Sequence, residues 1–312
     1  MRFWVGTTDN DWFDFLSRQR PPVDEVNFWQ PSGKPLFTSL PSGTPFLFKL
    51  KSPHNCIAGG GFFVQSSALP LSLAWATFDL KNGTSSRRDF ETRLRRLHEM
   101  ADARDPTILC NVLVQPFFWP REMWIDEPIG WAKNIVRGKT YDTAEADGAT
   151  LWSQVQQRLQ GALPTLEPTA DLRVAEAGQR YGSPTMQRQR LGQGAFRVVV
   201  QDAYQRRCAI TGENTLPALE AAHIKPYADE GPHEVSNGLL LRSDFHKLFD
   251  IGLVTVTPEL RVEVSQQIHD AYFNGKVYYR LHGQQLATLP ERFEHRPNPD
   301  FLKWHNERVF RA

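Results

Sequence analysis

Cysteine is scarce in this chain, and Cys56, Cys110 and Cys208 lie far apart with no CxxC pair among them. A disulfide framework or a cysteine-based zinc site requires paired cysteines, so we expect neither. Long apolar runs are also lacking. The longest, LPLSLAWATF and ILCNVLV, fall short of the roughly 20 residues that a transmembrane helix needs. The first residues, MRFWVGTTDNDW, include no extended apolar stretch of the kind found in secretory signal peptides. We therefore expect a cytoplasmic protein with no membrane partner.

A strong charge of one sign is absent from the chain as a whole, whose net charge is +1 over 312 residues. Residues 173–207, however, contain seven arginines against only Glu176 and Asp202, a local excess of five positive charges. Such a cluster is typical of a solvated helix face or of a surface that neutralises nucleic acid phosphates. Because the run leads directly into the histidine-containing segment described below, we favour nucleic acid. The side chains that we expect to contact a DNA backbone are Arg188, Arg190, Arg197, Arg207 and Lys225.

The N-terminal half is rich in tryptophan and in short strand-like segments. Eight of the nine tryptophans lie by residue 152. The segments PFLFKLK, GGFFVQSS, LAWATFDL and ILCNVLVQPFFW, broken by Gly and Pro, predict strands. SSRRDFETRLRRLHEMAD predicts a helix with a Ser cap and apolar Phe90, Leu94 and Leu97 near helical spacing. We expect a mostly β barrel or sheet with a few helices.

The second half changes character after a Pro-, Gly- and Arg-rich stretch. DGATLWSQVQQRLQGALP predicts a helix that leads into a linker. Beyond the linker, GAFRVVVQDAYQRRC has helical periodicity, whereas LEAAHI and LVTVTPELRVEVS have strand character. RSDFHKLFDIG predicts a short helix that opens on a Ser or Asp cap and stops near Gly252. The fold class that we expect is therefore α+β.

Residues 219–252 gather side chains suited to hydrolysis of a phosphodiester, which needs a base to activate water and a cation to stabilise charge. His223 ends a strand-like run before a loop, where a base is exposed. His246 and Asp250 lie four residues apart on the predicted helix, so both project from one face and can share a divalent ion. Asn237 lies in the loop between His223 and this helix, where its amide can pin the backbone or orient His223. A structural metal site and unrelated polar residues around a helical hairpin are the alternatives.

The segments LGQGAFRVVV, RRCAITGENTLPALEAAHIKPY and SNGLLLRSDFHKLFDIGLVTV together resemble the HNH module of restriction-type endonucleases, over about residues 190–312. The resemblance implies a ββα-metal fold. It also implies that His223 is the general base, that Asn237 is the motif asparagine that positions the loop, and that His246 is a metal ligand. One divalent ion is implied for each site, Mg²⁺ or Mn²⁺, with Ni²⁺, Co²⁺ and Zn²⁺ as alternatives.

This sequence departs from the HNH pattern at Ala222, where many HNH enzymes carry an Asp or His ligand just before the base. Another side chain must therefore complete the metal shell. Asp250 is the first choice by helical spacing, and Glu220, two residues before Ala222, is the second. Many HNH proteins also carry two CxxC zinc pairs. Because Cys208 stands alone here, we expect packing to hold this fold together instead.

The segments DWFDFL, VNFWQPSG, FLFKLK, IAGGGFFVQSS and PFFWPREMW resemble a PUA-superfamily domain of the EVE type, with more distant likeness to SRA and YTH readers, over about residues 1–145. These domains hold an extruded base in an aromatic pocket. We expect Trp12 and Trp29 to stack on the base, and Ser32 and Ser66 to contact its edge or a phosphate. Glycines 59 to 61 are expected to let the backbone approach the ligand closely.

Combined, these patterns predict a reader over residues 1–145, a helical and Arg-rich linker over 146–190 and an HNH endonuclease domain over 191–312. A reader fused to such a nuclease is the layout of modification-dependent restriction endonucleases. The expected function is a DNA endonuclease that flips and reads 5-methylcytosine or 5-hydroxymethylcytosine and cuts nearby double-stranded DNA as a homodimer. One alternative is a nucleic-acid-binding regulator with an inactive HNH scaffold. Another is a nuclease whose N-terminal half reads a protein partner or an RNA base.

Overall fold

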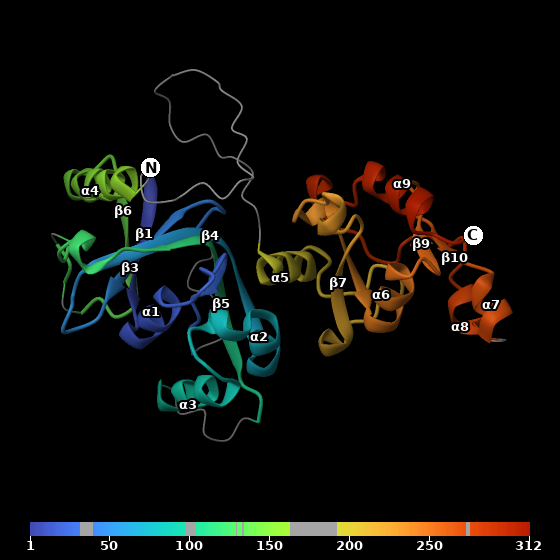
Figure 1. The fold of residues 1–312 in the computed structure, drawn as a ribbon, viewed down its shortest axis with the longest axis horizontal. Helices are drawn as coiled ribbons and strands as arrows, with labels where there is room; N and C mark the ends of the chain where they lie inside the picture. The colour runs from blue at the N-terminus through green and yellow to red at the C-terminus, as the bar shows by residue number, and fades with distance from the viewer. Residues whose placement is uncertain (32–39, 98–103, 129, 133, 163–191, 273–274) are drawn as a thin grey trace, which may run out of the picture. The chain divides into compact units, whose positions relative to one another are not determined.

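The computed structural model describes residues 1–31, 40–97, 104–128, 130–132, 134–162, 192–272 and 275–312. The chain divides into two compact units, Met1–Gln189 and Arg190–Ala312, each of which is described by itself (Figure 1). Both units mix helices and strands, which confirms the expected α+β class. Within the described ranges, no helix is both long and apolar enough to cross a membrane.

The N-terminal unit is built on a six-stranded sheet in the order β2-β5-β4-β3-β1-β6. Its strands are β1 (Arg2–Thr8), β2 (Glu25–Asn27), β3 (Pro45–Leu50), β4 (Ile57–Pro70), β5 (Thr107–Phe118) and β6 (Gly138–Asp142). β1 and β3 are parallel, and the other neighbours are antiparallel. The described sheet is open, because the short edge strands β2 and β6 do not pair with each other, so the expected barrel is not observed. β4 is long and curved (Figure 1), with two shifts in its register against β5.

In the described residues, four helices accompany this sheet: α1 (Asn10–Ser17), α2 (Leu71–Phe78), α3 (Arg87–Leu97) and α4 (Ala146–Ala162), together with the 3-10 turns η1 (Asp79–Asn82) and η2 (Arg121–Met123). The prediction of a strand for LAWATFDL was wrong, because this segment forms α2. Leu71, Leu73, Ala74 and Phe78 of α2 are buried, and a short apolar run of this kind does not separate helix from strand by periodicity. α3 confirms the predicted helix.

The core of this unit forms two clusters that follow the alternation of side chains along the strands. Phe46 and Phe48 lie in one cluster with Trp12 and Phe28. Leu47, between them in sequence, lies in the other cluster.

Helix α4 joins the second of these clusters, because Leu151 and Val155 pack there against the Phe3 side chain and its neighbours. Residues 146–162, which we expected in the linker, therefore pack on the N-terminal sheet.

Two glycines of β4 allow the backbones of neighbouring strands to approach closely. A Cβ on Gly59 would lie 2.2 Å from the Phe117 carbonyl oxygen, and one on Gly60 would lie 2.6 Å from the Phe46 carbonyl oxygen. Neither position tolerates a side chain without displacement of a neighbouring strand. The structure thus accounts for these two glycines by close approach of backbones within the sheet rather than by approach to a ligand.

The C-terminal unit contains a two-stranded hairpin followed by a helix, with further elements around it. The elements are α5 (Gln193–Ala203), β7 (Leu219–His223), β8 (Gly238–Arg242), α6 (Ser243–Asp250), β9 (Val254–Val256), β10 (Val262–Val264), α7 (Gln267–Tyr272), α8 (Lys276–Tyr279) and α9 (Pro299–Arg308), with the 3-10 turns Leu216–Ala218, Tyr227–Asp229, Val235–Asn237 and Phe293–His295. β7 and β8 are antiparallel, and both contact α5 and α6. The order β7, β8, α6 is the ββα arrangement that the HNH resemblance implies.

Packing rather than paired cysteines holds this unit together in the described residues. Cys208 is fully buried, and its Sγ accepts hydrogen bonds from the backbone N–H groups of Thr211 (3.4 Å) and Arg242 (3.3 Å). Phe196 of α5 and Phe245 of α6 are buried on the two helices that flank the hairpin.

The start of α6 differs from the prediction. Arg242 is the N-cap residue, and no side chain caps the helix. Ser243 is instead the first helical residue. Asp244 pairs with Arg242 through two hydrogen bonds of 2.6 and 2.7 Å. The end of α6 is as expected, because Gly252 follows it with a left-handed φ of 76°.

Candidate functional site

His223 is the last residue of β7, and its imidazole is enclosed on two sides. One face stacks on Phe196, with ring centroids 3.9 Å apart and planes at 10°. Its Nε2 lies 3.2 Å from Nδ1 of His233. Burial lowers the pKa of His223 to about 4, and the positive charges of His233 and His246 act in the same direction. The ring is therefore neutral near pH 7, which is the state that a general base requires.

Asn237 fixes the segment that connects β7 to β8. Its side chain is fully buried. The amide Nδ2 donates to the carbonyl oxygens of Lys225 and Pro232, each at 2.9 Å, while Oδ1 accepts from the N–H of Lys225 at 2.9 Å. Three hydrogen bonds from one side chain thus hold both ends of the loop that follows His223.

His246 lies on α6 between two carboxylates. Its Nδ1 is 2.6 Å from Oε2 of Glu220 on the neighbouring strand β7. Its Nε2 is 3.4 Å from Oδ2 of Asp250, one helical turn along α6. Because Nδ1 donates its proton to Glu220, Nε2 carries the lone pair of the neutral ring, and this nitrogen is the one that faces Asp250. Desolvation raises the pKa of Asp250, His246 acts to lower it, and Glu220 acts to raise it.

This pair fits a divalent metal ion. Two donor atoms bound to one ion at about 2.1 Å lie roughly 3.0–3.4 Å apart, and the His246–Asp250 separation of 3.4 Å falls at the end of that range. Glu220 then orients His246 through its other nitrogen, as carboxylates commonly do for metal-bound histidines. No three His, Cys, Asp or Glu side chains of the described residues form a complete ligand set. The remaining positions would therefore fall to water and phosphate.

A cavity of about 330 Å³ joins the base to the His246–Asp250 pair. It is lined by His223, Ile224, Pro226, His246, Phe249, Asp250, His305 and Val309. Residues from β7, α6 and α9 thus converge on one cavity, although His223 and Asp250 are 27 positions apart in sequence. The arrangement places a neutral imidazole and a candidate metal pair around a space open to solvent.

The structure describes three of the five predicted DNA-backbone residues, Arg197, Arg207 and Lys225. Arg188 and Arg190 lie outside the described residues. Arg197 of α5 has a buried Nε with no hydrogen-bond partner in the described part of the chain, and burial lowers its pKa against the opposing charge of Glu220. Arg207 is exposed. The Nζ of Lys225 lies 5.8 Å from the ring centroid of Trp304.

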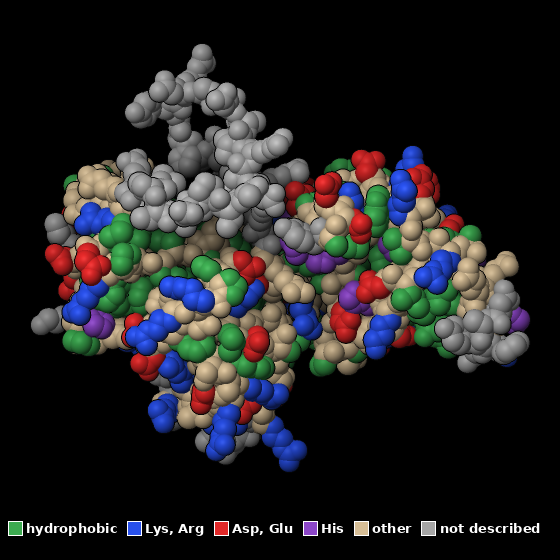
Figure 2. Space-filling model, in the orientation of Figure 1, with side chains coloured by type: hydrophobic (Ala, Val, Ile, Leu, Met, Phe, Trp, Pro, Cys, Tyr) green, Lys and Arg blue, Asp and Glu red, His purple; other side chains and the backbone are tan. Residues whose placement is uncertain are grey.

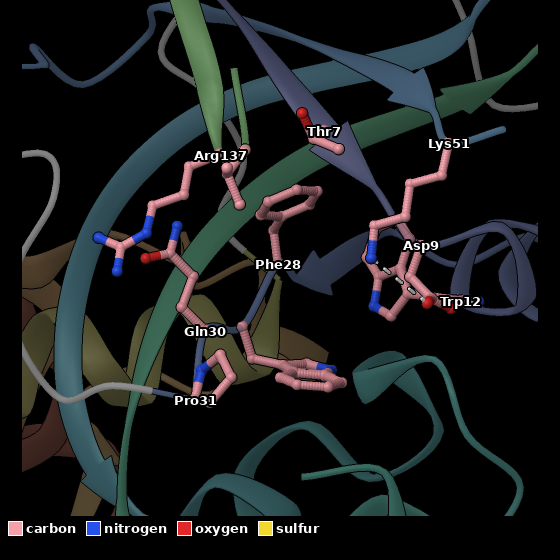
Figure 3. Close-up of a pocket in the computed structure, with 10 residues that line it drawn as sticks. Thr7, Asp9, Trp12, Phe28, Gln30, Pro31, Lys51 and Arg137 are labelled. Carbon is pink, nitrogen blue, oxygen red and sulfur yellow. Dashed lines mark hydrogen bonds and ion pairs between the residues drawn. The ribbon is translucent and has the colours of Figure 1, made fainter. Parts of the chain in front are cut away.

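The N-terminal unit contains a separate cavity of about 320 Å³ (Figure 3). Its lining residues are Thr7, Asp9, Trp12, Phe28, Trp29, Gln30, Pro31, Lys51, Val136 and Arg137. Figure 3 shows the Phe28 ring near the centre, with Gln30 and Arg137 on one side and Asp9, Lys51 and Trp12 on the other. Thr7 Oγ1 and Gln30 Oε1 are shielded from solvent and have no hydrogen-bond partner among the described residues. Two polar atoms of residues that line the cavity are therefore left without a hydrogen bond within the described structure.

Both predicted stacking tryptophans line this cavity, but they differ in burial. Trp12 is 3% exposed, and its indole N–H donates to the Asn27 carbonyl oxygen at 3.3 Å. Trp29 is partly buried, and its N–H donates to the carbonyl oxygen of Asn82 at 2.9 Å. Since both N–H groups are used within the protein, these side chains offer only their ring surfaces to a ligand.

Of the two predicted serines, Ser66 does not line the cavity. Ser66 lies on β4, and its hydroxyl donates to Asn111 Oδ1 at 2.6 Å. Ser32 lies outside the described residues.

Four residues of the two cavities and their surroundings were not predicted from the sequence: His233, Phe196, Gln30 and Thr7. His233 stands in GPHEVSNG between the two predicted catalytic residues, and a histidine in the segment that joins them is a usable signal. Phe196 carried no such signal, since a helix periodicity explains it fully.

Residues 208–257 match a family model described as HNH endonuclease. The matched segment contains Glu220, His223, His233, Asn237, His246 and Asp250, so the C-terminal unit carries an HNH endonuclease domain. No curated protein matches the chain. Among solved structures, the chain is similar to a "Modification dependent TagI restriction endonuclease" at 15% sequence identity, over 97% of this chain and 81% of that chain, with a TM-score of 0.28.

Proposed function

We propose that this protein is a DNA endonuclease that hydrolyses phosphodiesters with one divalent metal ion in each HNH site. The observation that carries the proposal is the cavity of the C-terminal unit, in which His223 meets the His246–Asp250 pair. A neutral base and two metal-binding side chains are the parts that hydrolysis of a phosphodiester requires.

In this mechanism His223 accepts a proton from the water whose oxygen attacks phosphorus, and the bond from phosphorus to the leaving oxygen breaks. Asn237 keeps the loop after His223 in place, and Glu220 keeps the His246 ring oriented. A divalent ion held by His246 and Asp250 would supply positive charge beside the phosphate and the leaving oxygen.

We further propose that the N-terminal cavity binds a flipped modified cytosine, 5-methylcytosine or 5-hydroxymethylcytosine. Aromatic side chains of Phe28, Trp12 and Trp29 provide surfaces for stacking, and Gln30 carries both an acceptor and donors for the edge of the base. A buried polar atom without a partner costs free energy that a correctly placed ligand atom recovers. Thr7 Oγ1 and Gln30 Oε1 are such atoms.

A basic helix adjoins this cavity. The arginines of α3 are Arg87, Arg88, Arg93, Arg95 and Arg96. Figure 2 shows Lys and Arg side chains gathered over the part of the N-terminal unit where Figure 1 places α3. Phe90 of α3 packs edge-on against Trp29, with ring centroids 5.3 Å apart, and Arg93 pairs with Asp9 at 3.3 Å. Positive charge beside the cavity suits a duplex whose backbone must be held while one base is extruded.

The test is digestion of matched plain, methylated and hydroxymethylated duplexes with Mg²⁺ or Mn²⁺, each with and without excess EDTA. We expect cleavage of a modified duplex that stops in EDTA. Cleavage that persists in EDTA would exclude the metal mechanism. Equal cleavage of all three duplexes would exclude the reader.

A regulator with an inactive HNH scaffold is the second candidate, and Ala222 favours it. This residue is fully buried in β7 and brings no metal-binding atom where many HNH enzymes carry one. Binding of modified DNA without cleavage under any of the metals tested would favour the regulator over the nuclease.

A further inference from the structure

The loop between β7 and β8 places a second histidine against the proposed base. His233 lies edge-on to His223, with ring centroids 4.9 Å apart and planes at 89°. Nδ1 of His233 is 3.2 Å from Nε2 of His223. The Phe196 ring stacks on a face of the His223 ring. This stack fixes the plane of the His223 ring but does not distinguish its two nitrogens.

The position of His233 is itself fixed by Asn237. The Asn237 amide donates to the carbonyl oxygen of Pro232, the residue directly before His233, at 2.9 Å. The backbone N–H of Ile224, directly after His223, donates to the Asn237 carbonyl oxygen at 2.9 Å. One buried asparagine thus ties together the two short segments that carry the two histidines.

A neutral imidazole has one N–H and one lone pair, and the partner of one nitrogen determines the role of the other. Two arrangements of the His223–His233 contact are possible in principle. If Nε2 of His223 carries the proton, Nδ1 is the lone pair and is available as a base. If His233 donates instead, Nε2 is occupied as an acceptor and Nδ1–H is unable to take a proton from water.

We infer that His233 is a positioning residue that accepts a hydrogen bond from Nε2–H of His223 and thereby keeps Nδ1 of His223 unprotonated for the reaction. The inference rests on the proposed nuclease function, in which His223 is the base. His223 lines the cavity, and Nδ1 is the ring nitrogen that does not contact His233. After proton transfer His223 carries two N–H groups, and His233 still accepts from Nε2, so the same contact also stabilises the product state.

Two substitutions of His233 test this role. His233→Leu removes the acceptor and keeps a side chain of similar size, whereas His233→Asn keeps an oxygen near the position of Nδ1. We expect His233→Leu to slow cleavage of the modified duplex by about ten- to a hundredfold, the range typical for loss of the outer partner of a metal-bound histidine, which sets the form of its ring in the same way. His233→Asn should recover most of the rate. The matched control is His295→Leu, a half-buried histidine of the same unit outside the cavity, which should cut at the wild-type rate.

The second readout is the protonation of the His223 ring, measured by ¹⁵N NMR of histidine-labelled, metal-free protein near pH 7. We expect the Nε2–H form in the wild type and a shift toward Nδ1–H in His233→Leu. Nδ1–H in the wild type, or unchanged nitrogen shifts and rate in His233→Leu, would overturn the inference. So would equal losses of rate in His233→Leu and His233→Asn. If the wild type cuts no DNA, the proposed function falls, whereas the nitrogen shifts still decide whether His233 sets the form of His223.

Discussion

The chemistry proposed for the C-terminal cavity depends on single side chains, and substitution of His223 tests it most directly. We expect His223→Ala to lower the cleavage rate by about 10²–10⁴-fold or more, because the other neutral imidazole that lines the cavity, His305, uses both ring nitrogens within the protein. DNA affinity and the folded state should be retained, as judged by binding to modified duplex and by thermal unfolding. Cleavage close to the wild-type rate would remove His223 from the reaction.

The two carboxylates beside His246 should differ in what they do to metal affinity. Asp250→Asn removes a proposed ligand and should abolish measurable binding of Mn²⁺ by calorimetry. Glu220→Gln should weaken it by about 10–100-fold, because Glu220 contacts His246 through the nitrogen that faces away from Asp250. A larger loss in Glu220→Gln than in Asp250→Asn would exchange the two roles.

For single residues, the sequence predicted which side chains belong to the site better than it predicted which of them are in contact. The spacing of His246 and Asp250 on a helix predicts that they share a face, and the structure places them together. The contact of Glu220 with the far side of His246 depends on the pairing of β7 with β8 and on the packing of α6, so no local pattern contained it. The same holds for Phe196, which reaches His223 from α5 across the hairpin.

Helix α9 is joined to the HNH core by His305, whose protonation should couple pH to stability. His305 is 2% exposed, and its ring stacks on Phe249 with centroids 3.7 Å apart. The Nε2–H donates to the Phe249 carbonyl oxygen at 3.1 Å, and Nδ1 accepts from the Thr255 hydroxyl at 2.8 Å. Burial lowers the pKa of His305 from 6.5 to about 4.

Because the unfolded chain takes up this proton at a higher pH than the folded chain does, the stability is present above pH 6.5 and is lost as pH falls toward 4. Between pH 7 and pH 5 we expect His305 to cost about 2 kcal/mol of unfolding free energy. His305→Gln cannot titrate, so urea unfolding of this variant should show a smaller decrease between the two pH values. An identical decrease in both proteins would show that His305 does not titrate in this range.

Helices and strands with clear boundary residues were predictable from the sequence. Features that depend on burial or on the pairing of distant strands were not. The strand LEAAH and the helix around His246 are bounded by turns and glycine, and both were found. α2 was misread because its apolar residues are buried on most sides, which removes the periodicity that identifies a helix. The open edge of the N-terminal sheet was not predictable either, since closure depends on whether β2 and β6 meet, and strand sequences do not encode that pairing.

For the molecule as a whole, the composition of the two halves predicted two functions, and each unit carries its own cavity. If one reads and the other cuts, substitutions in the first cavity should change the choice of DNA without changing the chemistry. Trp12 is a poor site for this test, because a buried tryptophan replaced by alanine costs about 3–5 kcal/mol of stability. Trp29 and Gln30, both only partly buried, are better.

We expect Trp29→Ala to weaken binding to modified duplex by about one to two orders of magnitude, since stacking of a base on an aromatic ring contributes roughly 1–3 kcal/mol. Gln30→Leu should reduce the preference for modified over plain duplex while it leaves affinity for plain duplex, which depends on phosphate contacts and salt, nearly unchanged. Trp152→Ala is the matched control, because Trp152 is partly buried against Phe3 in the other core cluster and lies outside the cavity. The measurement is the affinity of the wild type and of each variant for the modified and the plain duplex at one salt concentration. Equal losses on modified and plain DNA in Trp29→Ala, matched by Trp152→Ala, would make Trp29 a structural residue. A selective loss confined to modified DNA would assign recognition to the N-terminal cavity.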